Sequence, residues 1–102
     1  LMEVVEMELR EVIERLERLE RRLSELRRKL REQGYSIKKI NGFTYVYVWE
    51  YINGRQVWRY VGNADRIDLA EFKNERVKDL LQEYKALEEK AKKITEALKD
   101  LL

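Results

Sequence analysis

The sequence predicts an α+β fold in which a long helix, a three-stranded antiparallel β-meander and a second long helix follow one another. Three observations predict it: a heptad repeat of apolar residues near each end of the chain, alternating aromatic and β-branched residues between them, and two Asn-Gly pairs in that middle stretch. With 102 residues, the chain is expected to form one domain that spans residues 1–102.

Residues 1–33 are predicted to form one amphipathic helix. Its apolar residues recur at alternating steps of three and four, the spacing that keeps a and d positions on one side of a coiled-coil helix. These seam residues are Met2, Val5, Leu9, Val12, Leu16, Leu19, Leu23, Leu26 and Leu30. Glu and Arg fill most positions between them and favour the helix. Gly34 is placed to end it in a left-handed conformation.

Residues 35–62 are predicted to form the meander. Asn41-Gly42 and Asn53-Gly54 each suit a type I′ turn, because both central residues of that turn need positive φ. Two-residue turns fix the strand register, and they place Trp49 opposite Trp58 and Tyr47 opposite Tyr60.

This register gives the sheet one aromatic face and one face rich in valine. The aromatic face carries Ile40, Phe43, Tyr45, Tyr47, Trp49, Tyr51, Trp58 and Tyr60. The valine face carries Ile37, Val46, Val48, Val57 and Val61, interspersed with Lys39, Thr44, Glu50, Arg55 and Arg59. The helices must cover at least one face, and the sequence leaves open which one. The other face is left for a partner chain or a ligand.

Residues 66–102 are predicted to form the second helix, with Asp65 or Asp68 as the cap at its start. Its seam residues are Val77, Leu80, Tyr84, Leu87, Ala91, Ile94, Leu98 and Leu101. The apolar residues before Val77 leave this register, so a bend or a change of packing partner is expected near residues 70–76.

The two seams match when the helices run antiparallel and the numbers of contacting residues sum to 103, as for Leu23 with Leu80 and Met2 with Leu101. Both chain ends then lie together and the meander caps the opposite end. The flanking charges favour this coiled-coil hairpin over a parallel homodimer, although Arg15 approaches Lys90 in it. Pairing within one chain and pairing between chains both stay open.

A two-helix hairpin buries little core, so two hairpins are expected to associate into a four-helix bundle, as a homodimer or a higher oligomer. The residues expected at the oligomer interface are Leu16, Leu19, Leu23, Ile13, Leu81, Trp49 and Trp58.

Composition excludes several classes of function. Without Cys or His, the chain has no disulfide, no zinc site of the usual ligands, no thiol nucleophile and no Ser-His-Asp triad. No carboxylate pair stands apart from basic partners, and the glycines form no phosphate-binding pattern. We therefore expect no enzyme, no cofactor, no metal and no small-molecule substrate. No apolar stretch suits a membrane span or a secretory signal, so a cytoplasmic protein is expected.

Basic residues concentrate where the first helix meets the sheet. From Arg21 to Arg59 there are ten basic residues and only three acidic ones, although the whole chain carries a formal charge of +2. A basic end beside β-structure suits phosphate binding. The alternative is that these side chains only solvate the flanks of the coiled coil. The residues expected to contact nucleic acid are Arg27, Arg28, Arg31, Lys38, Lys39, Arg55 and Arg59, the first three as phosphate anchors and Arg59 for specific contacts.

A likeness to a known family is carried by Tyr45-Val46-Tyr47, Glu50-Tyr51, Asn53-Gly54 and Arg59-Tyr60-Val61-Gly62, followed by a helix. This stretch resembles the N-terminal segment of archaeal fuselloviral integrases, which are tyrosine recombinases, and it covers about a fifth of the chain. The 102 residues do not include the catalytic domain of that family.

The resemblance implies a DNA-associated or oligomerising accessory module from an archaeon or its mobile elements. A composition rich in Glu, Lys and Arg also suits a thermophile. Val48 and Val57 stand where the relative has charged residues, and this departure favours protein burial over DNA contact on their face.

Two functions are therefore expected. The first is a non-enzymatic, homo-oligomeric DNA-binding accessory protein whose basic sheet end contacts phosphates and enters a groove. The alternative is an oligomeric protein-interaction scaffold or chaperone module that uses the aromatic face, since the helix–sheet–helix order resembles the prefoldin β-type subunit in architecture. Leu1 precedes Met2, which fits either a start at Met2 behind a tag remnant or a fragment of a longer protein.

Overall fold

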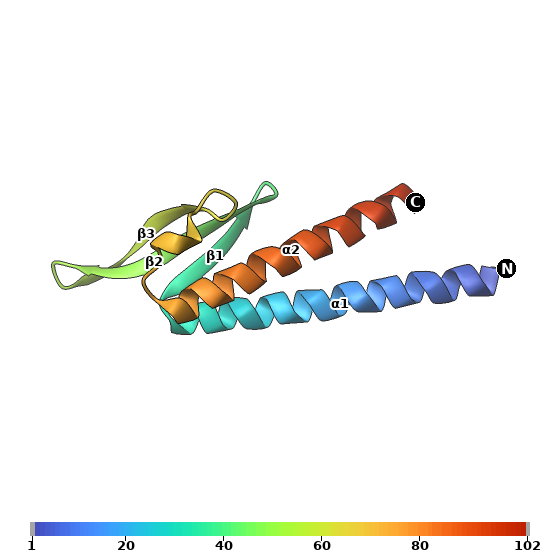
Figure 1. Ribbon diagram of the computed structural model, residues 1–102, viewed down its shortest axis with the longest axis horizontal. Coiled ribbons are helices and arrows are strands. Elements are labelled where there is room, and N and C mark those ends of the chain that lie inside the picture. The colour runs from blue at the N-terminus through green and yellow to red at the C-terminus, as the bar shows by residue number, and fades with distance from the viewer. Residues whose placement is uncertain (1, 102) are drawn as a thin grey trace.

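A computed structural model describes residues 2–101 and confirms the predicted order of helix, meander and helix (Figure 1). The elements are α1 (Met2–Glu32), β1 (Tyr35–Ile40), β2 (Phe43–Ile52), β3 (Arg55–Asn63), the 3-10 helix η1 (Leu69–Glu71) and α2 (Glu75–Leu101). The molecule is elongated, 65 × 25 × 22 Å, and both chain ends lie away from the sheet. The predicted contact between Met2 and Leu101 falls on side chains outside the described part of the structure, which covers the backbone of residues 2–101 and the side chains of residues 3–100. None of the described helices is long and apolar enough to cross a bilayer.

The Asn-Gly turns form as predicted, with φ values of 52° and 82° at Asn41 and Gly42, and 52° and 77° at Asn53 and Gly54. The register is also confirmed, because Trp49 pairs with Trp58 and Tyr47 pairs with Tyr60. Gly34 has the expected left-handed conformation after α1, with a φ of 86°.

A β-bulge at Val61 interrupts the ladder between β2 and β3, and the sequence did not predict it. Tyr60 pairs with Tyr47 whereas Gly62 pairs with Val46, so Val61 has no partner on β2. A Cβ atom at position 62 would lie 3.1 Å from Cγ1 of Ile67. Glycine therefore lets the segment after β3 cross close to the sheet on its way to the helices.

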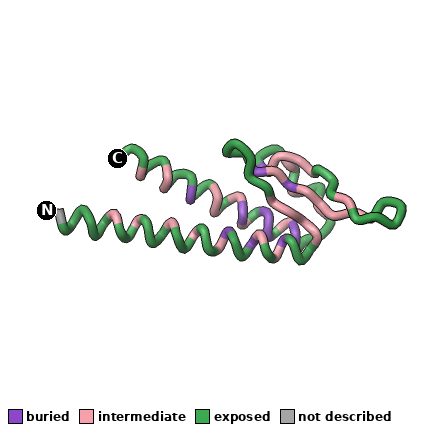
Figure 2. The backbone as a smooth tube through the Cα atoms, turned by 180° about the vertical axis from the view of Figure 1, so that it is seen from behind, coloured by how far each residue is buried: buried purple, intermediate pink, exposed green. Residues whose placement is uncertain are grey.

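The valine face of the sheet is the buried one. Val46 and Thr44 are the buried residues of the sheet, and the hydroxyl of Thr44 donates to the Glu88 carboxylate at 2.8 Å. Tyr35, on the same face, packs its ring against Phe72 with 5.9 Å between ring centroids. The helices and the 64–74 segment thus cover this face, and Figure 2 shows the buried residues gathered at that junction.

Helix α2 begins at Glu75 rather than at residue 66, which corrects the predicted start. Asn74 caps it, because its side-chain oxygen accepts from the backbone N–H groups of Arg76 at 3.0 Å and Val77 at 3.2 Å. Asp68 caps only the short η1, through the N–H of Ala70 at 2.9 Å. The break predicted near residues 70–76 exists as an extended stretch between η1 and α2.

The two helices pack antiparallel within one chain (Figure 1). The buried cluster consists of Leu23, Leu26, Leu30, Val46, Ala64, Val77, Leu80, Leu81, Tyr84 and Ala91. Arg22 spans the helices and donates to Glu83 from Nε at 2.8 Å and from Nη2 at 3.1 Å. These hydrogen bonds are the main reason that the pKa of Arg22 is raised. The pair flanks Leu23 and Leu80, as the predicted register requires.

Truncating the core at the junction should destabilise the whole chain. Leu30 is fully buried, so Leu30→Ala is expected to lower the free energy of unfolding by about 2–5 kcal/mol. Ile52 is an apolar residue with 51% of its surface exposed, and Ile52→Ala should cost less than about 1 kcal/mol. Urea unfolding followed by circular dichroism measures both. Equal losses in the two variants would contradict the position of the core.

Candidate functional site

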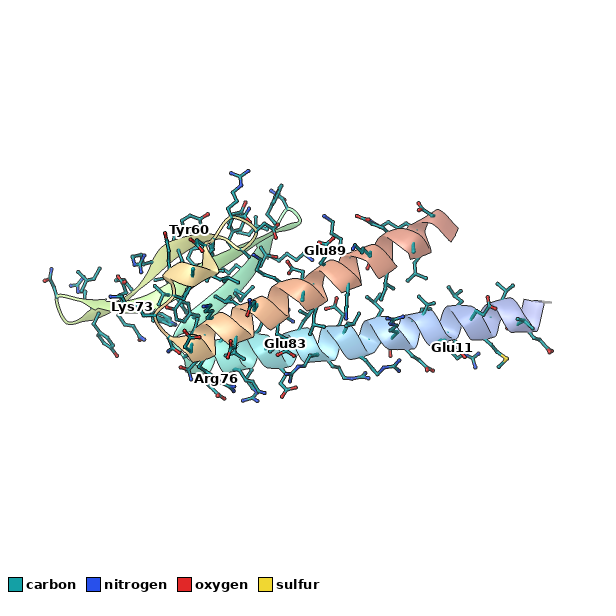
Figure 3. The ribbon with its side chains drawn as sticks, in the orientation of Figure 1. Glu11, Tyr60, Lys73, Arg76, Glu83 and Glu89 are labelled. Atoms are coloured by element: carbon teal, nitrogen blue, oxygen red, sulfur yellow. The ribbon has the colours of Figure 1, made fainter. Side chains whose placement is uncertain are left out.

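The aromatic face of the sheet is left uncovered by the rest of the described chain. None of its rings, from Phe43 to Tyr60, belongs to the buried cluster. Tyr51 and Tyr60 expose 77% and 52% of their surface. Tyr60, labelled in Figure 3, lies on the side of the sheet away from the helices. An exposed apolar patch of this kind usually marks a binding surface.

The rings of this face pack against one another across the strands. Trp49 and Trp58 have ring centroids 3.6 Å apart, and Tyr60 lies 5.5 Å from Tyr47 and 6.1 Å from Tyr45. These contacts form two groups, the tryptophan pair and a cluster of three tyrosines, and together they join three residues of β2 to two of β3. These five rings hold one another across the strands, which preorganises this part of the face for a ligand.

The polar residues of the aromatic face are Ser36, Lys38, Gln56 and Asn63. Strands β1–β3 are described in full, and their register places no carboxylate on this face. The Lys38 ammonium lies 5.0 Å from the centroid of the Tyr47 ring, within the range of a cation–π contact. Glu50, the acidic residue of the sheet, is on the valine face. The aromatic face is therefore neutral to positive in charge.

Two of the basic residues predicted to bind nucleic acid sit at opposite ends of the valine face. Lys39 pairs with Thr44 next to the first turn, whereas Arg55 pairs with Ile52 next to the second. These two partners are eight positions apart on β2, which is about 26 Å in a strand. Arg59 lies between them and binds Glu50 through Nε at 2.6 Å.

Three of the predicted cations belong to α1, where two of them contact other side chains of the chain and the third is exposed. Arg27 donates to the hydroxyl of Tyr84 at 3.1 Å, Arg28 pairs with Glu32, and Arg31 is exposed. Arg27 and Lys39 both line a groove between α2 and the sheet, together with three lysines and five acidic residues. The structure thus spreads the seven predicted cations over several surfaces, and it brings none but Lys38 onto the aromatic face.

The residues predicted for an oligomer interface also differ in their surroundings. Leu23 and Leu81 are buried in the core of their own chain, and Leu16 and Leu19 pack against that core. Trp49 is half-buried beneath Trp58. Two of the seven, Ile13 and Trp58, are exposed.

Two polar contacts of the junction were missed by sequence reasoning. Thr44 was placed among the valines of its face without its bond to Glu88, and Tyr84 was assigned to the seam without its bond to Arg27. A tyrosine at a seam position otherwise held mostly by leucine is the one signal that predicts such a polar partner. Burial is the main reason that the pKa of Tyr84 is raised, and it outweighs the opposing effect of Arg27.

No group of three or more acidic side chains suited to a metal ion occurs in the part of the chain that the structure describes. Comparisons with models of known protein families, with characterised proteins and with solved structures found no match for this chain. The resemblances to fuselloviral integrases and prefoldin subunits therefore stay predictions.

The raised pKa of Tyr84 predicts a loss of stability at alkaline pH. Above about pH 10, Tyr84 of the unfolded chain releases its proton before Tyr84 of the folded chain does. The free energy of unfolding must then fall as the pH rises further. Tyr84→Phe, which cannot ionise, should show a smaller fall than the wild type in urea unfolding between about pH 9 and 11. The exposed Tyr51→Phe is the control, and a Tyr84→Phe slope equal to that of the wild type would contradict the assignment.

Proposed function

We propose that this chain is a non-enzymatic DNA-binding protein that binds through the aromatic face of its sheet. One observation carries the proposal: the face that the helices leave uncovered is aromatic, carries Lys38 and has no carboxylate. The whole sheet, residues 35–63, holds four basic residues and one acidic residue. A polyanion with exposed bases is the ligand class that matches both properties.

The chemistry of the rings favours unpaired bases over a closed duplex. Stacking needs access to the face of a base, which the neighbouring bases of a duplex hide. A base stacked on an aromatic side chain contributes about 1–3 kcal/mol and is tolerant of sequence. Tyr51 and Tyr60 are the most exposed tyrosines of the face and are the proposed stacking residues.

The phosphate contacts are few in this arrangement. Lys38 lies on the binding face. Arg55 is on the valine face beside the turn of the β2–β3 hairpin, and its long side chain is proposed to reach a phosphate around the hairpin tip. Arg59 is already bound to Glu50, so its proposed role is to hold the hairpin rather than to read a base. Two phosphate contacts on single-stranded DNA give a slope of about −1.4 for log K against log salt.

The alternative function is a protein-interaction scaffold that uses the same face. The specific observation in its favour is the close packing of Trp49 on Trp58, which turns two rings into one apolar surface. Tyrosine and tryptophan are enriched in protein interfaces for this reason. The alternative requires no phosphate contact and no role for Lys38.

The proposal predicts measurable binding to single-stranded DNA. In fluorescence anisotropy with a labelled oligonucleotide, Tyr60→Ala should weaken binding by about tenfold or more, because it removes a stacking ring. Lys38→Ala should make the salt slope shallower by about 0.7, the loss of one phosphate contact. Ile52→Ala removes an exposed apolar side chain from the opposite face and should leave binding unchanged.

Absence of binding at low salt would contradict the proposal and leave the aromatic face to a protein partner. Binding that survives Tyr60→Ala and keeps its salt slope in Lys38→Ala would place the DNA on another surface. Tighter binding to a duplex than to a single strand would show that the sheet enters a groove instead of stacking on bases.

A further inference from the structure

The apolar seam of α1 continues well beyond the region where it is buried. Among the described side chains of α1, Leu23 is the first buried one, although the seam begins many residues earlier. Val5 and Ile13 expose 62% and 41% of their surface, and Leu9 is half-buried. Figure 1 shows why: α1 and α2 are close at the sheet and separate toward the chain ends.

The charges beside the seam change where the helices separate. Arg22 and Glu83 attract each other where the helices are close. One heptad nearer the chain ends, the equivalent positions are Arg15 and Lys90, which repel each other. Figure 3 shows Glu83 in the closed part, whereas Glu11 projects from the part of α1 that has parted from α2.

The exposed seam of α1 forms one stripe. At 100° per residue, Val5, Leu9, Val12 and Ile13 fall within a sector of about 100°, the width of a helix face that packs against another helix. Leu16, which packs against the buried cluster, continues the same stripe toward the sheet. A helical segment of this length gains little stability from propensity alone. Burial by another helix is what such a stripe requires.

We infer that this stripe binds a second copy of the same chain, with α1 antiparallel to α1 of its partner. Leu9 then meets the partner's Val12, and the contacting residue numbers sum to 21. In this register Arg15 faces the partner's Glu8, a charge of opposite sign, by the same geometry that places Arg22 beside Glu83. The two-fold axis makes two such ion pairs.

The partner's Glu8 thus gives Arg15 the opposite charge that Lys90 of its own chain does not provide. Ile94 and Leu98 of α2 are half-buried and lie on the other side of the opening, so the two open hairpins together form an antiparallel four-helix arrangement. This contact leaves the aromatic face free, and it is independent of the proposed function.

Sedimentation equilibrium of the intact chain over a range of concentrations tests the inference. The wild type should sediment at twice the 12.5 kDa of one chain when concentrated. Arg15→Glu and Glu8→Arg should each raise the dissociation constant of the dimer by about tenfold, because each sets like charges against each other. The triple variant Glu8→Arg/Arg15→Glu/Lys90→Glu restores opposite charges between the copies and keeps like charges at positions 15 and 90 within each chain, so it should return to within about twofold of the wild type.

Leu9→Asp places a charge in the stripe and should abolish the dimer. Met7→Asp is the matched control, because Met7 is exposed on the opposite side of α1. The buried cluster lies elsewhere, so circular dichroism should show both variants folded. A wild type that is monomeric at every concentration would overturn the inference. So would a dimer that survives Leu9→Asp, or a triple variant as weak as the single ones.

Discussion

The structure depends on one buried cluster at the point where α1, α2 and the sheet meet. Leu26 and Leu30 from α1, Val77 from α2 and Val46 from β2 are completely buried there. Because all three elements need this cluster, it decides which sheet face is covered, and the aromatic face is left outside. The ion pair of Arg22 with Glu83 lies beside the cluster and connects the two helices. Outside the cluster, the sheet exposes its aromatic face and α1 exposes its apolar stripe.

Those surfaces have different chemistry and are kept apart by the shape of the molecule. The sheet carries aromatic rings and Lys38 at one end, and the open helices carry aliphatic side chains at the other. A surface of tyrosine and tryptophan suits a ligand that is partly polar, whereas a stripe of leucine, valine and isoleucine suits another helix. The proposed functions of the two ends follow from this difference, and neither obstructs the other.

The heptads and the Asn-Gly turns predicted the elements and the strand register, because both are local patterns. The covered face of the sheet was not predictable, since both faces are apolar and the choice rests on tertiary contacts such as Thr44 with Glu88. The start of α2 was misplaced because Asn74, its cap, sits within an otherwise helix-like run. The basic residues were predicted to form one patch. Consecutive residues of a strand face opposite sides of the sheet, so Lys38 and Lys39 lie on different faces.

Hydrogen exchange, measured residue by residue on a dilute sample, tests the central role of the cluster most directly. The slowest exchange is expected for the backbone amides of Leu26, Leu30, Leu80 and Leu81, which open only with global unfolding. Amides of residues 5–16 should exchange orders of magnitude faster, because no buried side chain holds that part of α1 in a single chain. Even protection along the whole of α1 in a dilute sample would contradict the central role of the cluster.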